Sequence, residues 1–228
     1  MTEKNFKKSA LALLLFSSFY FLASSSSAQT APELIVTWKS NAYAPAGYQG
    51  KVTPTQGSAI TVSAELLDAS KPADLSRSLM VWRVDTELIA RARGAKTITY
   101  KVPDDASGEL TVDLSVTYQG VERTAVITIP VANPEVVINV PSLTNTVSAS
   151  VHLIKALLYS FNIKNPNDLT IEWLVNDIAP EGSPADPFSL EINTSILPPG
   201  QFVRLNLVIQ NPDNPTQIFS QNRQLIIQ

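Results

Sequence analysis

The chain has no cysteine and a single histidine, His152, among its 228 residues. Without cysteine, no disulfide can brace the fold, and no lipid can be attached to a cysteine at a cleavage site. A Cys-His nucleophile pair is excluded as well, and a zinc site is disfavoured because zinc takes most of its ligands from Cys and His side chains. Each folded unit must therefore be stabilised by its own apolar core.

An excess of positive charge is also missing, because 17 Lys and Arg stand against 20 Asp and Glu. Nucleic acids and anionic membranes are bound through basic surfaces, so no nucleic-acid partner is expected. The sequence has neither a Gly-x-Ser-x-Gly elbow nor an Asp-x-Asp-x-Asp-Gly loop, the motifs of many hydrolases and calcium sites. Composition alone leaves a Ser-His-Asp arrangement open, but no spacing suggests one. We expect no enzyme activity, no cofactor and no metal ion.

The first 28 residues have the pattern of a secretory signal peptide. Three lysines fall within the first eight residues, a mostly apolar run of 14 follows at 10–23, and small residues end the segment at Ser26-Ser-Ala28. This pattern predicts cleavage after Ala28 and export to the periplasm, the cell surface or the medium. The run is shorter than the roughly 20 residues that span a bilayer, so an uncleaved anchor is the less favoured alternative and would be the only membrane contact.

Two related stretches organise the rest of the chain, Met80-Val-Trp-Arg-Val-Asp85 and Ile171-Glu-Trp-Leu-Val-Asn176. In both, an apolar residue, Trp and Val occupy alternate positions, as in a half-buried strand. A glycine that opens another alternating run follows Trp82 after 26 residues and Trp173 after 27. This recurrence indicates two copies of one structural unit. We expect Trp82 and Trp173 to lie in the two cores, in preference to stacking on sugar rings at the surface.

Alternation of apolar and polar residues predicts an all-β fold without a convincing helix. About seven strands in a hundred residues are typical of an antiparallel β-sandwich. In the second copy the pattern predicts a strand with Val147, Ala149, Val151 and Leu153 facing the core, which would place His152 on the opposite, exposed face. Asn133-Pro134 marks the boundary between the copies. The predicted organisation is a signal peptide at 1–28, one sandwich at 29–132 and a second at 133–228.

One loop is a candidate binding site. Residues 40–57 are rich in Pro, Gly and Tyr, and Tyr43, Pro45 and Tyr48 lie together in it. Loops at the ends of sandwiches often carry binding, and tyrosine supplies rigid contact area with a polar tip. The alternative is that these tyrosines cover the open end of the sandwich. Both interpretations follow from the sequence.

The paired Trp strands, the downstream glycines and the Pro-containing boundary resemble a tandem of bacterial Ig-like or PKD-type β-sandwich domains, as found in exported bacterial two-domain proteins. The chain departs from both patterns: it has no disulfide beside the Trp, and Val84-Asp-Thr-Glu87 stands where PKD domains have a Gly-Asp-Gly type of turn. The resemblance implies a spacer, adhesin or assembly module. We therefore expect a non-enzymatic structural or interaction module of the cell envelope or extracellular space, with an exported or envelope protein as its partner. The alternative is a carbohydrate-binding protein that uses the Tyr43–Tyr48 loop to hold a polysaccharide.

Overall fold

The computed structural model describes residues 31–142, 144–181 and 186–228. The predicted signal peptide lies outside these residues. The described chain is built from β-strands, with one short 3-10 helix, η1 (Pro166–Asp168), and no α-helix. Across the ranges given, nothing forms a helix of the length and apolarity needed to cross a membrane.

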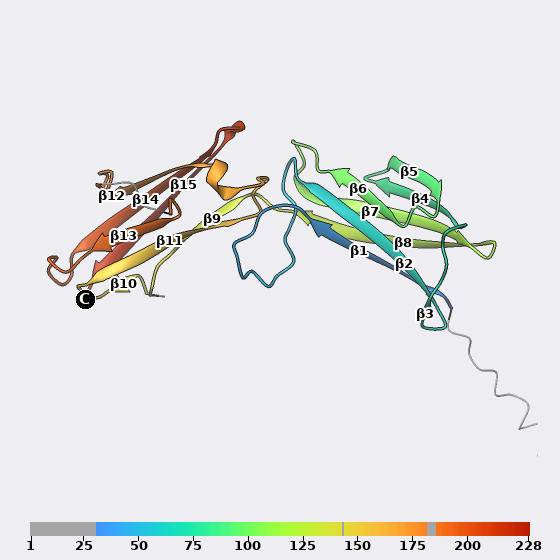
Figure 1. The fold of residues 1–228 in the computed structure, drawn as a ribbon, viewed down its shortest axis with the longest axis horizontal. Helices are drawn as coiled ribbons and strands as arrows, with labels where there is room; N and C mark the ends of the chain where they lie inside the picture. The colour runs from blue at the N-terminus through green and yellow to red at the C-terminus, as the bar shows by residue number, and fades with distance from the viewer. Residues whose placement is uncertain (1–30, 143, 182–185) are drawn as a thin grey trace, which may run out of the picture. The chain divides into compact units, whose positions relative to one another are not determined.

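The strands form two consecutive Ig-like antiparallel β-sandwiches (Figure 1). Each of the four sheets takes its strands from one side of residues 132–134 only. One sheet of the first sandwich contains β1 (Glu33–Ser40), β2 (Ala59–Asp68), β3 (Lys71–Pro72) and β6 (Thr97–Lys101). Its other sheet has the strand order β5 (Glu87–Arg93), β4 (Leu79–Val84), β7 (Gly108–Tyr118) and β8 (Val121–Val131). One sheet of the second sandwich has the strand order β13 (Ser189–Asn193), β11 (Val151–Tyr159) and β9 (Glu135–Asn139). Its other sheet has the order β10 (Thr146–Val147), β15 (Asn214–Ile227), β14 (Phe202–Asn211) and β12 (Thr170–Val175).

Leu66–Ala73, which includes the end of β2, the turn and β3, belongs to one compact unit, and Leu34–Glu65 and Asp74–Gln228 belong to another. Within it, Leu67 pairs with Pro72 and Asp68 with Lys71. The Ala73 amide donates a hydrogen bond of 2.8 Å to the Leu66 carbonyl. The turn is therefore held by its own backbone bonds.

The core of the first sandwich follows from the two-residue period of its strands. β2 buries Ile60, Val62 and Ala64, and β7 buries every second residue from Leu110 to Val116. Trp82 on β4 is fully buried, and its Nε1 donates a hydrogen bond of 2.7 Å to the carbonyl of Ala95. The ring is therefore buried without leaving its N–H unpaired.

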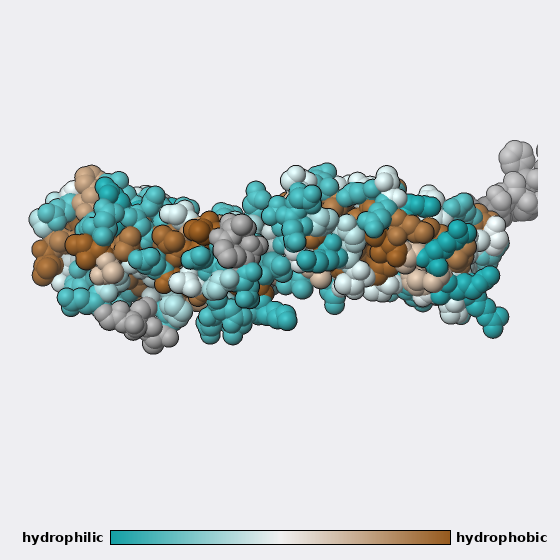
Figure 2. All heavy atoms as spheres, turned by 90° about the horizontal axis from the view of Figure 1, so that it is seen from above, coloured by the Kyte–Doolittle hydropathy of each residue, from teal (hydrophilic) through white to brown (hydrophobic). Residues whose placement is uncertain are grey.

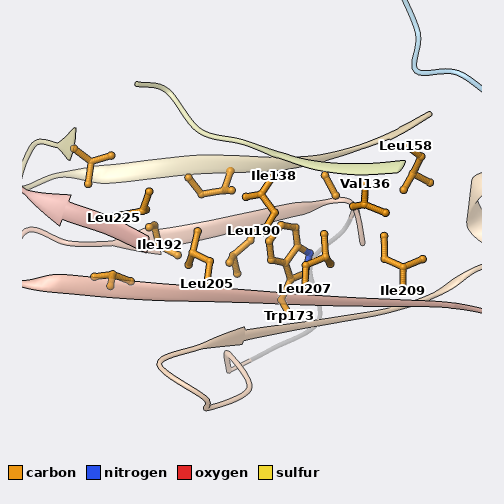
Figure 3. Packing of buried hydrophobic residues seen from close by; sticks show 14 of the residues in the cluster. Val136, Ile138, Leu158, Trp173, Leu190, Ile192, Leu205, Leu207, Ile209 and Leu225 are labelled. Atoms are coloured by element: carbon orange, nitrogen blue, oxygen red, sulfur yellow. The ribbon is translucent and has the colours of Figure 1, made fainter. Parts of the chain in front are cut away.

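The second sandwich repeats this arrangement around Trp173 on β12. Figure 3 shows its ring between side chains from both sheets, among them Leu190 of β13 and Leu207 of β14. Its Nε1 donates a hydrogen bond of 3.1 Å to the carbonyl of Pro187. In both sandwiches the indole N–H thus bonds a backbone carbonyl in the segment that leads into the strand of the opposite sheet, β6 or β13.

The strand predicted from Val147 to Leu153 is correct only at its first residue: Val147 is buried in the core, on the separate short strand β10, whereas Ala149, Val151 and Leu153 are exposed. β11 begins at Val151 and buries Ile154, Ala156 and Leu158, so Val151 and Leu153 face outward. The sequence of β11 is apolar on both faces, and alternation over its first residues therefore does not identify the buried face. Contacts of Ile154, Ala156 and Leu158 with the rest of the core determine the facing.

Candidate functional site

The loop between β1 and β2 carries the three predicted binding residues, Tyr43, Pro45 and Tyr48. Tyr43 is half-buried and forms an isolated antiparallel bridge with Phe161, whose carbonyl accepts a 2.7 Å hydrogen bond from the Tyr43 amide. Tyr43 also packs against the core cluster to which Phe161 belongs. Its backbone is therefore held by Phe161, just beyond β11, and its side chain packs against the core cluster.

Tyr48 lies at an exposed turn of the same loop. Its amide donates a 3.1 Å hydrogen bond to the carbonyl of half-buried Pro45, and Gly47 between them has a φ of +84°, which suits glycine. Its side chain is 46% exposed, and the ring meets that of Tyr159 edge to face, with 5.8 Å between centroids. Tyr48 thus keeps contact area open to solvent while resting on a second aromatic ring.

Lys51, in the same loop, contacts a third aromatic side chain, that of Trp38. Its Nζ lies 3.7 Å from the centroid of the Trp38 ring on β1, a cation–π contact. Partial burial lowers the pKa of this amine from its ordinary value because the charged form is partly desolvated. The contact joins the second half of the loop to β1.

The outer face of β11 presents apolar side chains that the sequence had assigned to the core. Val151 is 55% exposed and Leu153 is 52% exposed. Farther along the same face, half-buried Leu157 lies opposite Val137 of β9. Glu191 of β13 lies opposite Leu153. We call Val151, Leu153, Leu157 and Val137 the β11 outer strip; exposed Lys155 interrupts this apolar set between Leu153 and Leu157.

Polar groups converge on the opposite sheet of the second sandwich. Asp177 accepts hydrogen bonds from Arg204 Nη1 at 3.1 Å and from Asn206 Nδ2 at 2.8 Å. These groups line a shallow depression together with Asn222 and Gln224. Because the side chains of Asp177 and Arg204 are both well exposed to water, the ion pair contributes little to stability. Sequence reasoning missed this cluster, because it depends on the pairing of β14 with β12 on one side and with β15 on the other.

His152 is on the inward side of β11, not on the outward face that the sequence predicted. Its Nε2 lies 2.7 Å from the carbonyl of Ser148 and 3.2 Å from the hydroxyl of Ser150. A carbonyl oxygen can only accept, so Nε2 carries a proton in this arrangement. It therefore does not act as a base toward the Ser150 hydroxyl. Within the described ranges, no three acidic or histidine side chains are grouped to hold a metal ion.

Fold and surface together define an all-β protein of two Ig-like sandwiches with an aromatic loop and an apolar outer strip. No protein-family model matches the chain. No curated protein matches it either.

Among solved structures, the fibronectin(III)-like modules of Clostridium thermocellum CbhA are 15% identical, with a TM-score of 0.29, and the match covers 85% of this chain and 94% of that one. The N-terminal domains of the bacteriophage RB49 outer capsid protein Hoc are 10% identical, with a TM-score of 0.43, covering 86% of this chain and 59% of that one. The Bacteroides ovatus protein SGBP-B, solved with a mixed-linkage heptasaccharide, is 12% identical, with a TM-score of 0.27 and coverage of 86% and 47%.

Proposed function

We propose that the chain is an exported, non-enzymatic module of the cell envelope or extracellular space that binds another exported protein. Residues 1–28 would direct export, and 29–132 and 133–228 would be its two domains. The observation that carries the proposal is the β11 outer strip, where Val151 and Leu153 are each more than half exposed. Neighbouring exposed apolar side chains on one sheet face, with charged residues beside them, can form the apolar centre and polar rim of a protein interface.

The charged residues beside the β11 outer strip indicate what kind of partner surface would fit it. Leu153 lies between Glu191 on the neighbouring strand and Lys155 two residues along β11. A partner with an apolar centre and polar groups of both signs at its margin would match this surface. Figure 2 shows hydrophobic side chains among hydrophilic ones on the face in view. Exposed apolar residues are therefore common on this protein and do not by themselves identify a binding surface. What distinguishes the strip is that its members share one sheet face.

Replacing Val151 and Leu153 together with threonine is expected to abolish partner capture. Threonine keeps strand propensity, exchanges one methyl group of Val151 for a hydroxyl and removes the larger part of the Leu153 side chain. The measurement is a cross-linking pull-down from the envelope and culture medium of the native host. We expect at least one exported protein to be enriched by the native chain and its recovery to fall about tenfold or more with the double variant. The matched control is Ile196→Thr, which removes an exposed isoleucine outside β11. Equal recovery with the double variant and the control would refute the proposal.

A second candidate function, carbohydrate binding through the Tyr43–Tyr48 loop, is favoured by one observation: the partly exposed Tyr48 ring beside Tyr159. Tyr43→Ala and Tyr48→Ala separate the two functions. Because Tyr43 packs against the core cluster, its replacement is expected to lower the free energy of unfolding by about 1–2 kcal/mol. Tyr48→Ala should change stability less. Retention on a polysaccharide column that is lost in Tyr48→Ala at unchanged thermal stability would establish sugar binding in place of protein binding.

A further inference from the structure

β8 is an 11-residue strand at the end of its sheet, Val121–Val131 (Figure 1). It pairs with β7 along its whole length, and no strand of the described chain pairs with its other side. The unpaired backbone groups of such an edge can bind another strand, and proteins often protect long edges with charges or prolines. β5, the other edge of this sheet, carries Arg91 and Arg93. In β8 the central residues Thr124–Ile129 include neither a charge nor a proline.

The hairpin that precedes β8 identifies which backbone groups face outward. Tyr118 and Val121 flank the two-residue turn Gln119-Gly120, in which both φ angles are positive. A turn of this kind closes on a hydrogen-bonded pair, and bonded pairs then recur at every second residue. The odd-numbered residues of β8 therefore bond β7, whereas the even-numbered residues direct their N–H and C=O groups to the free edge.

Two further residues agree with this assignment. Ala132, the next even-numbered residue beyond the strand, donates its N–H away from β7, to the carbonyl of Pro54 at 2.8 Å. Pro130 is also even-numbered, and a proline is tolerated where no ladder partner needs its N–H. Backbone donors at Glu122, Thr124, Val126 and Thr128 thus face outward, and no backbone acceptor within the described part of the chain pairs with them.

We propose that β8 is a self-association site, at which two copies of the chain pair edge to edge in an antiparallel, two-fold arrangement centred on Val126. The residues themselves argue for a second copy as the occupant. With Val126 opposite its counterpart, the two strands overlap from end to end, and even-numbered residues meet even-numbered residues. About eight backbone hydrogen bonds can then form, since Pro130 can accept but cannot donate.

Side chains match in the same register. Thr124 lies opposite the partner's Thr128, and Val126 opposite the partner's Val126, which are favourable β-branched pairs. Glu122 faces Pro130, and Arg123 faces Ile129, so no like charges meet. The Val126 side chain is 63% exposed in the single chain and would gain a neighbour of its own kind. This site lies in the first sandwich and is independent of the β11 outer strip.

The test is sedimentation of the full chain over a wide concentration range, with substitutions at Val126. The native chain is expected to show a reversible monomer–dimer equilibrium. Val126→Lys and Val126→Glu each place like charges opposite one another and should raise the dissociation constant about tenfold or more. An equimolar mixture of the two variants should restore the dimer, because Lys then faces Glu. The exposed position makes both substitutions compatible with folding, which circular dichroism checks.

A backbone variant tests the hydrogen bonds directly. Val126→Pro removes an N–H that the β7–β8 ladder does not use, and it should also raise the dissociation constant about tenfold or more. Val126→Thr keeps the N–H and the branched side chain and should leave dimerisation unchanged. A native chain that stays monomeric throughout, or charge variants that dimerise normally, would overturn the proposal. A dimer that is lost in the Val151/Leu153 double variant instead would place self-association on β11. Partner capture in the pull-down should persist in Val126→Lys, so the two proposals fail separately.

Discussion

Replacing Trp82 with alanine is expected to lower the free energy of unfolding by about 3–5 kcal/mol, the largest effect of any single change considered for this chain. The ring is fully buried between the two sheets of the first sandwich, so its removal leaves a cavity that the surrounding strands cannot close. It also leaves the Ala95 carbonyl without the indole donor that now lies 2.7 Å away. No disulfide is present to offset the loss. Urea denaturation followed by circular dichroism measures the change.

Two control variants separate the contributions of the ring. Trp82→Phe keeps most of the apolar volume and removes the hydrogen bond, so its cost should be about 1–3 kcal/mol. Trp38→Ala removes a half-buried tryptophan that contacts Lys51, and its cost should be about 1 kcal/mol. If Trp82→Ala proved no more costly than Trp38→Ala, the assignment of Trp82 to the core would be wrong.

Gly94→Ala is expected to destabilise the first sandwich by about 1–3 kcal/mol, because two costs combine at this turn. Gly94 has a φ of +68°, and a Cβ at this position would lie 2.8 Å from the backbone oxygen of Ser76. The Gly94 amide also bonds the Ser78 carbonyl at 3.0 Å, so the backbone cannot move away without losing that bond. Thermal unfolding measures the effect as a lowered midpoint.

Gly108→Ala provides the matched control for that substitution. Gly108 has a similar φ of +79°, but a Cβ there would meet nothing within 4 Å. It therefore carries only the conformational cost of a positive φ, about 1 kcal/mol. Equal losses in the two variants would show that the contact with Ser76 is relieved without cost. A larger loss at Gly94 would show that the turn preceding Ala95 is fixed in place.

The parts of the fold that sequence predicts well are strands with one polar face. β2 and β7 alternate between apolar residues and Thr, Ser or Asp, and only one facing buries the apolar set. The recurrence around Trp82 and Trp173 predicts two units because each Trp stands at the same place in the same pattern. The loop at 40–57 is also predictable, since its prolines and glycines interrupt any period.

The parts that sequence does not predict depend on contacts between distant residues. β11 is apolar on both faces, so only its neighbours determine that Ile154 is buried and Leu153 exposed. The contact of Tyr43 with Phe161 joins residues far apart in the chain, and no local pattern indicates it. Alternation identifies β8 as a strand, but its place at the sheet end comes from strand order. The candidate surfaces are therefore less predictable than the strands that carry them.

The two indole–carbonyl hydrogen bonds have a practical consequence. Exchange of a buried, hydrogen-bonded N–H with deuterium requires the surrounding structure to open first. The Nε1 protons of Trp82 and Trp173 each lie in one sandwich and give separate signals in a nitrogen-15 NMR spectrum. Their exchange rates therefore time the opening of each sandwich within the intact chain. The protein therefore has one built-in exchange probe in each sandwich, and no reporter group has to be attached to it.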